Sequence, residues 1–231
     1  NHSKKTIWTD NWIENWESLH DIKNKVVNNI LKILSNKDED YIEEDFSKID
    51  NEAYQSYLKA KYIFETRKSD KDYPQIENLL NQSINKNKQF IAPYLLLGDY
   101  YLAKNNFNDS LKFYEESLEI SLKSENKINI AKSLNSIGKI YHFNGKFDKA
   151  YDYYKKAMQI WNKGNHYLGT ADTFNLIGAI HHYNGRFNKA LACYQDSYKT
   201  YKIINDNIGL CKASFNIANM YSTMGDFDNA L

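Results

Sequence analysis

The chain has 231 residues, of which 42% are hydrophobic and 26% charged, and its formal net charge at pH 7 is +1. This balance favours neither nucleic acid nor an acidic membrane surface as a partner, and no apolar run approaches the roughly 20 residues that span a bilayer. Cys193 and Cys211 are too few for a disulfide framework and are typical of small packing residues in a reducing compartment. We therefore expect a cytoplasmic protein without membrane contact.

Residues 1–50 precede the regular part of the chain and are predicted to form a segment of their own. Residues 6–12 begin with a short strand-like piece and an acidic turn. From about Trp16 to Leu34, apolar side chains recur every three or four residues, which predicts an amphipathic helix. We interpret this segment as the remnant of an upstream domain.

Residues 51–231 contain a repeat with a period of 40 residues. A small residue recurs at Gly98, Gly138, Gly178 and Ala218, and a turn glycine at Gly145, Gly185 and Gly225. A phenylalanine recurs at Phe107, Phe147, Phe187 and Phe227, and a second small residue at Ser110, Ala150, Ala190 and Ala230. A fixed period of this length indicates stacked supersecondary units.

Each unit is predicted to be two helices joined by a tight turn. Leu134, Ile137 and Tyr141 fall on one helical face, as do Phe147 and Tyr154 after the turn. The Asn-Gly pair between them ends the first helix, since glycine adopts the left-handed conformation without steric cost. Because Gly138 and Ala150 are small, we expect the backbones of the paired helices to approach closely there.

The pattern resembles the tetratricopeptide repeat, in a 40-residue form with lengthened helices. The resemblance implies an all-α fold, a right-handed superhelical solenoid of antiparallel helix pairs with about four and a half repeats and an N-terminal helical segment. The expected repeats span residues 53–90, 91–130, 131–170 and 171–210, with a truncated copy at 211–231. The first copy is the most degenerate.

A second resemblance concerns the N-terminal third. Ile7-Trp8-Thr9-Asp10, followed by residues 19–26, is similar to the join between a TolB-like segment and a repeat array in bacterial class III adenylate cyclase-type signalling proteins. It implies a regulatory region of a larger bacterial protein that carries a cyclase-like or DNA-binding domain elsewhere. The chain starts at Asn1 and stops at Leu231, where a second helix begins, and we expect it to be part of a longer protein.

The first helices of a stacked array are expected to line a concave groove. Positions of the first helices that avoid the packing face are the candidates for binding a peptide. They are Asp99, Lys132, Asn135, Lys139, His142, Asp172, Asn175, His182, Lys212, Asn216 and Asn219. Asn135 and Asn175 share one repeat position, and an asparagine amide both donates to and accepts from a peptide backbone. An asparagine-rich composition explains the recurrence equally well.

No motif for catalysis, cofactor binding or metal binding is evident. His142 and His182 recur at one position without a third ligand, so we expect packing or solvated histidines and no metal site. The chain lacks a phosphate-binding loop and a nucleophile with a placed base, so no enzyme activity or cofactor is predicted for it. Three functions remain: a scaffold for a protein or peptide, a peptide sensor that changes the shape of the superhelix, and a structural spacer. Self-association through exposed repeat ends is a further expectation.

Overall fold

The computed structural model describes residues 49–67 and 73–230. Within these ranges the chain forms ten α-helices and no β-strand. The helices are α2 (Asn51–Thr66), α3 (Tyr73–Lys86), α4 (Ala92–Ala103), α5 (Phe107–Lys123), α6 (Lys127–Phe143), α7 (Phe147–Lys163), α8 (Tyr167–Tyr183), α9 (Phe187–Ile204), α10 (Asn207–Thr223) and α11 (Phe227–Ala230). The strand-like piece and the amphipathic helix predicted before residue 49 lie outside the described residues.

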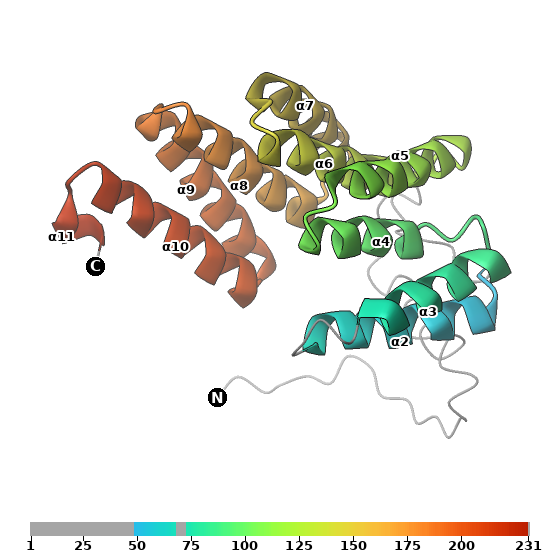
Figure 1. Ribbon diagram of the computed structural model, residues 1–231. Coiled ribbons are helices and arrows are strands. Elements are labelled where there is room, and N and C mark those ends of the chain that lie inside the picture. The colour runs from blue at the N-terminus through green and yellow to red at the C-terminus, as the bar shows by residue number, and fades with distance from the viewer. Residues whose placement is uncertain (1–48, 68–72, 231) are drawn as a thin grey trace, which may run out of the picture.

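The helices form successive antiparallel pairs, α2–α3 to α10–α11, that follow one another along an arc (Figure 1). Each helix contacts the helices before and after it in the chain. The first helices of neighbouring pairs also contact each other more closely than the second helices do. The first helices therefore lie on the concave side, and the predicted solenoid of helix pairs is confirmed.

The turns from α4 onward end their helices with one shared geometry. One residue adopts the left-handed conformation, with φ between 50° and 80°, and the next backbone N–H donates to the carbonyl five residues earlier. These left-handed residues are Asn105, Glu125, Gly145, Asn165, Gly185, Asn205 and Gly225. The arrangement is a Schellman motif, which satisfies the last carbonyls of a helix. The sequence predicted it for the turn glycines, and the structure extends it to the linkers between pairs.

Aromatic rings fill the space opposite the recurring glycines. A methyl group added at Gly138 would collide with the ring of Tyr154, and the same relation holds for Gly98 with Tyr114. The glycines therefore make room for a tyrosine ring, a role that the sequence analysis did not predict. The paired helices still approach each other at the second small residue. Ser110, which replaces the recurring alanine, is fully buried, and its hydroxyl donates to the carbonyl oxygen of Gly98 at 2.7 Å.

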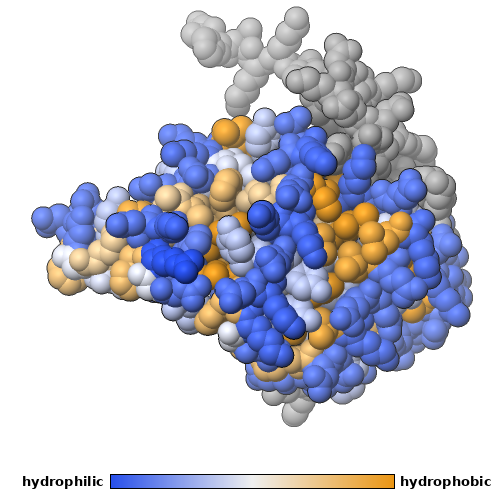
Figure 2. Space-filling model, turned by 90° about the horizontal axis from the view of Figure 1, so that it is seen from above, coloured by the Kyte–Doolittle hydropathy of each residue, from blue (hydrophilic) through white to orange (hydrophobic). Residues whose placement is uncertain are grey.

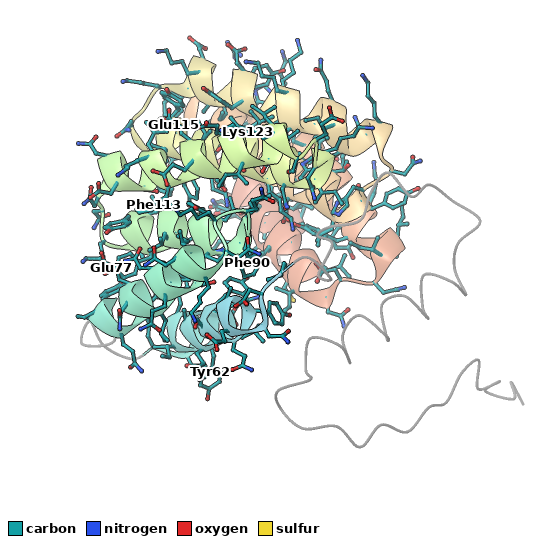
Figure 3. The ribbon with its side chains drawn as sticks, turned by 90° about the vertical axis from the view of Figure 1, so that its right-hand side faces the viewer. Tyr62, Glu77, Phe90, Phe113, Glu115 and Lys123 are labelled. Atoms are coloured by element: carbon teal, nitrogen blue, oxygen red, sulfur yellow. The ribbon has the colours of Figure 1, made fainter. Side chains whose placement is uncertain are left out.

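The core is a series of small clusters between neighbouring helices. In α5, α7 and α9 a buried tyrosine packs on the first helix of the next pair: Tyr114 on Ile140, Tyr154 on Ile180 and Tyr194 on Met220. Phe90 lies among the helices, whereas Glu115 and Lys123 lie along the outer side of α5 (Figure 3). Seen from above, the surface is mostly hydrophilic, with hydrophobic patches exposed between the polar side chains (Figure 2).

Candidate functional site

A groove follows the concave side of the array and consists of two adjoining pockets. The larger pocket, of about 650 Å³, is lined mainly by α4, α6, α8 and α10. The second, of about 520 Å³, is lined mainly by α2 and α4 and contains the rings of Tyr57, Phe64 and Phe90. Leu95 and Lys132 line both pockets, so the two form one continuous surface. We call it the groove; the larger pocket is its polar section and the smaller its aromatic section.

The structure brings most of the predicted site residues together. Those that line the polar section are Asp99, Lys132, Asn135, Lys139, Asp172, Asn175, Lys212 and Asn216. The other three candidates lie elsewhere. His142 packs edge-on against the rings of Phe147 and Tyr183 at the end of α6, and His182 packs near Phe187. Asn219 lines a shallow hollow beside Phe227.

Several groove residues were not predicted. Trp161 lies at the end of α7 and His166 in the linker that follows, whereas the sequence analysis sought site residues on the first helices only. His166 is the N-cap of α8, and its Nδ1 accepts a hydrogen bond from the backbone N–H of Gly169 at 3.1 Å. Gly169 has no side chain because the indole of Trp161 occupies that space. The sequence does contain a signal for this contact. Trp161 is followed eight residues later by Gly169, and the same spacing recurs between Tyr201 and Gly209.

Two tyrosines position the carboxylates of the groove. The hydroxyl of Tyr114 donates to Oδ1 of Asp99 at 2.6 Å, and that of Tyr201 donates to Oδ1 of Asp172 at the same distance. Burial, followed by the neighbouring carboxylate, raises the pKa of both tyrosines. Both phenols therefore remain protonated donors at neutral pH, and each holds its carboxylate at the groove surface.

The asparagines connect neighbouring first helices. Nδ2 of Asn135 donates to Oγ1 of Thr173 at 2.7 Å and so joins α6 to α8. Nδ2 of Asn175 donates to the hydroxyl of Tyr201 at 3.4 Å, and Nδ2 of Asn216 donates to Oδ1 of Asn175 at 3.5 Å. Both recurring asparagines, Asn135 and Asn175, therefore help to hold helices together, whether or not they also contact a ligand.

Comparison with known sequences identifies the family. A sequence model of the tetratricopeptide repeat matches residues 89–163, 129–203 and 169–231. Successive matches begin 40 residues apart, as the recurring glycines do, and together they cover more than half of the chain. The chain belongs to the tetratricopeptide repeat family. A search of curated proteins finds no match.

Solved tetratricopeptide-like structures share the fold. A Rap protein in complex with competence and sporulation factor aligns with a TM-score of 0.68 at 14% identity, over 93% of this chain and 56% of that one. The apo form of RapI gives 0.63 at 13% identity, over 78% and 66%. BtubC from P. vanneervenii gives 0.60 at 17% identity, over 77% and 84%. At such identities the similarity establishes the fold alone.

Two buried polar atoms of residues that line this tetratricopeptide groove have no hydrogen-bond partner in the described part of the chain. They are Oδ1 of Asn135 and Nε1 of Trp161. The two side chains are 8% and 1% exposed, and both residues line the polar section. A buried polar atom without a partner is unfavourable by about 1–3 kcal/mol. Both atoms are themselves buried, so a ligand reaches them only after neighbouring side chains move.

Three further properties of the described residues concern metal binding, thiol reactivity and membrane crossing. No group of three histidine, cysteine or acidic side chains among them is arranged to hold a metal ion. Burial raises the pKa of the Cys193 thiol to about 11, which keeps it protonated and weakly nucleophilic at neutral pH. None of the described helices combines the length and apolar character that crossing a membrane requires.

Proposed function

We propose that the chain binds an extended polypeptide segment of a partner protein in the groove. The observation that carries this proposal is a pair of buried, unpartnered atoms on residues that line the groove, Oδ1 of Asn135 and Nε1 of Trp161. A peptide backbone supplies both an N–H donor for the asparagine and a carbonyl acceptor for the indole. Because both atoms are buried in the structure, the ligand makes these contacts only when the side chains around them move aside.

The two sections of the groove differ in character and together fit a ligand with one apolar end and one acidic end. The aromatic section presents the partly exposed rings of Tyr57 and Phe64, which favour apolar side chains. The polar section combines Lys132, Lys139 and Lys212 with Asp99 and Asp172. Three lysines against two carboxylates leave the polar section with a positive excess, so it favours acidic side chains of the ligand over basic ones.

The experiment selects short random peptides displayed on phage against the immobilised protein and then measures their affinity by fluorescence anisotropy. Trp161→Phe removes the indole donor but retains an aromatic ring, and it should weaken binding by about threefold to tenfold. Tyr154→Phe is the matched control, since the Tyr154 hydroxyl is also buried and unpartnered but does not line the groove. Equal affinity in both variants, or no enriched peptide, would contradict the proposal.

A peptide sensor is the second candidate, favoured by the hydrogen bonds that join α8, α9 and α10. At 3.4 and 3.5 Å, the bonds from Asn175 to Tyr201 and from Asn216 to Asn175 are long. A ligand that competes for these amides would change the spacing of the repeats. Small-angle X-ray scattering with a selected peptide distinguishes the two functions, because a sensor becomes more compact and a scaffold keeps its radius of gyration.

We also propose that the array is a regulatory region of a larger bacterial signalling protein. The support is the similarity of residues 7–10 and 19–26 to the junction between TolB-like segments and repeat arrays. Reading the gene on both sides of this segment tests the proposal. A cyclase-like or DNA-binding domain would support it, whereas an open reading frame with repeats only would indicate a free-standing adapter.

A further inference from the structure

Outside the groove, aromatic rings follow the edge of the solenoid at which first helices turn into second helices. We call this the turn edge. Each second helix from α5 onward begins with a phenylalanine, and at two positions the last residue of the next first helix covers its ring. Phe143 stacks on Phe107 with ring centroids 6.4 Å apart and planes 22° apart. Tyr183 stacks on Phe147 at 5.5 Å and 18°.

The third position lacks the covering ring. The residue that corresponds to Phe143 and Tyr183 is Thr223, the last residue of α10. Thr223 and Phe187 line an open hollow of about 550 Å³, together with Met224. The hollow therefore lies where the repeat places an aromatic ring in the two preceding units.

The charges around the hollow are positive. Arg186 and Lys189 line it, and no acidic side chain of residues 49–67 or 73–230 does. None of the ion pairs among the described residues involves either cation. Their field also reaches His181, whose pKa is lowered first by burial and then by Lys189 and Arg186. A ligand that brings carboxylates to this position gains electrostatic attraction.

We propose that the hollow binds an aromatic side chain within an acidic segment of another protein. The ring would stack on Phe187 as Tyr183 stacks on Phe147, and flanking carboxylates would face Arg186 and Lys189. Stacked aromatic pairs contribute about 0.5–1.5 kcal/mol beyond the area they bury, so a single ring binds weakly and the acidic flanks supply specificity. This surface is separate from the groove, so its test does not depend on the proposed function.

The test uses the three methionines as probes. The protein is labelled with ¹³C at the methionine methyl groups and titrated with acetyl-Glu-Tyr-Glu-amide. Met224 lines the hollow and is 36% exposed, whereas Met220 is fully buried and Met158 lies on α7. We expect an upfield ring-current shift of the Met224 methyl alone, with a Kd on the order of 1 mM. Acetyl-Glu-Leu-Glu-amide and acetyl-Lys-Tyr-Lys-amide should cause no saturable shift.

Two variants complete the test. Thr223→Tyr restores the covering ring and should weaken peptide binding by at least about tenfold, or 1.4 kcal/mol, while leaving peptides selected for the groove unaffected. Thr223 is exposed, and tyrosine is already tolerated at the equivalent position 183. Thr223→Ser is the control and should bind as the parent does. Three results would overturn the proposal: an unmoved Met224, full binding by Thr223→Tyr, or a Met224 shift that follows protein concentration without peptide.

Discussion

Two sets of positions in this chain differ in how far the 40-residue repeat preserves their residue types. Between helices the repeat preserves chemistry: a glycine faces a tyrosine ring in three successive pairs. On the concave face, by contrast, residues that lie 40 positions apart differ in chemical character. Equivalent positions there hold Lys132, Asp172 and Lys212, or Leu95, Asn135, Asn175 and Phe215. The buried positions determine how the pairs stack. The concave positions differ from unit to unit, although Asn135, Asn175 and Asp172 each bond to a neighbouring helix.

The largest expected effect compares two adjacent residues, one from each set. Gly178 faces the ring of Tyr194, whose Cε1 would lie 2.7 Å from an added methyl group. Gly178→Leu should lower the free energy of unfolding by about 3 kcal/mol, because the larger side chain displaces a packed ring. Ala179→Leu, one residue further along α8 at the position of Lys139, should change it by less than about 0.5 kcal/mol.

Urea titration followed by circular dichroism measures both variants. Because stability in repeat proteins is a sum over neighbouring units, the loss from Gly178→Leu should appear mainly in α8, α9 and α10. Hydrogen exchange in those helices checks this localisation. If Gly178→Leu unfolds at the same urea concentration as Ala179→Leu, the interior position does not require glycine and the comparison fails.

A smaller effect distinguishes two equivalent tyrosines. The hydroxyl of Tyr114 donates to Asp99 on the groove surface, whereas that of Tyr154 has no partner among the described residues, since Lys139 stands where Asp99 does in the unit before. Tyr114→Phe should destabilise the protein by about 1–2 kcal/mol. Tyr154→Phe should be neutral or slightly stabilising, because it removes a buried polar atom that gains nothing.

Thermal melts of the two phenylalanine variants under identical conditions provide the measurement. A similar loss in both would mean that the hydroxyl contributes through packing, and that the bond to Asp99 adds no stability. A loss confined to Tyr114→Phe would show that concave residues, although variable, contribute to stability through the interior residues that hold them.

The fold was predictable because the signals that set it recur. Gly145 ends α6 as expected, with φ of 69°, and the pairs follow the 40-residue period. The groove was predictable only where it lies on first helices. Trp161 and His166 reach it from a second helix and a linker, and their roles depend on how one pair is stacked on the next. A helical pattern within one unit carries no information about that stacking.

Helix geometry also explains why two candidates lie outside the groove. His142 and His182 are the penultimate residues of α6 and α8, where the side chain lies beside the turn and the following phenylalanine. Burial lowers the pKa of His142, as expected for an imidazole among rings. Asn135 and Asn175 bridge helices, so replacing both with alanine would alter the packing of the array as well as any binding.

The smallest expected effect concerns the turns, where one geometry is built from different residues. Gly145 and Glu125 both have a positive φ, 69° and 55°, but only glycine adopts this conformation without steric cost. Glu125→Gly should therefore raise the free energy of unfolding by about 0.5–1 kcal/mol. Ser124→Gly is the matched control, since Ser124 has φ of −88° and glycine there should be neutral or slightly destabilising. A gain in both would mean that the linker favours any flexible residue; a gain in Glu125→Gly alone would mean that turns within and between pairs obey one conformational rule.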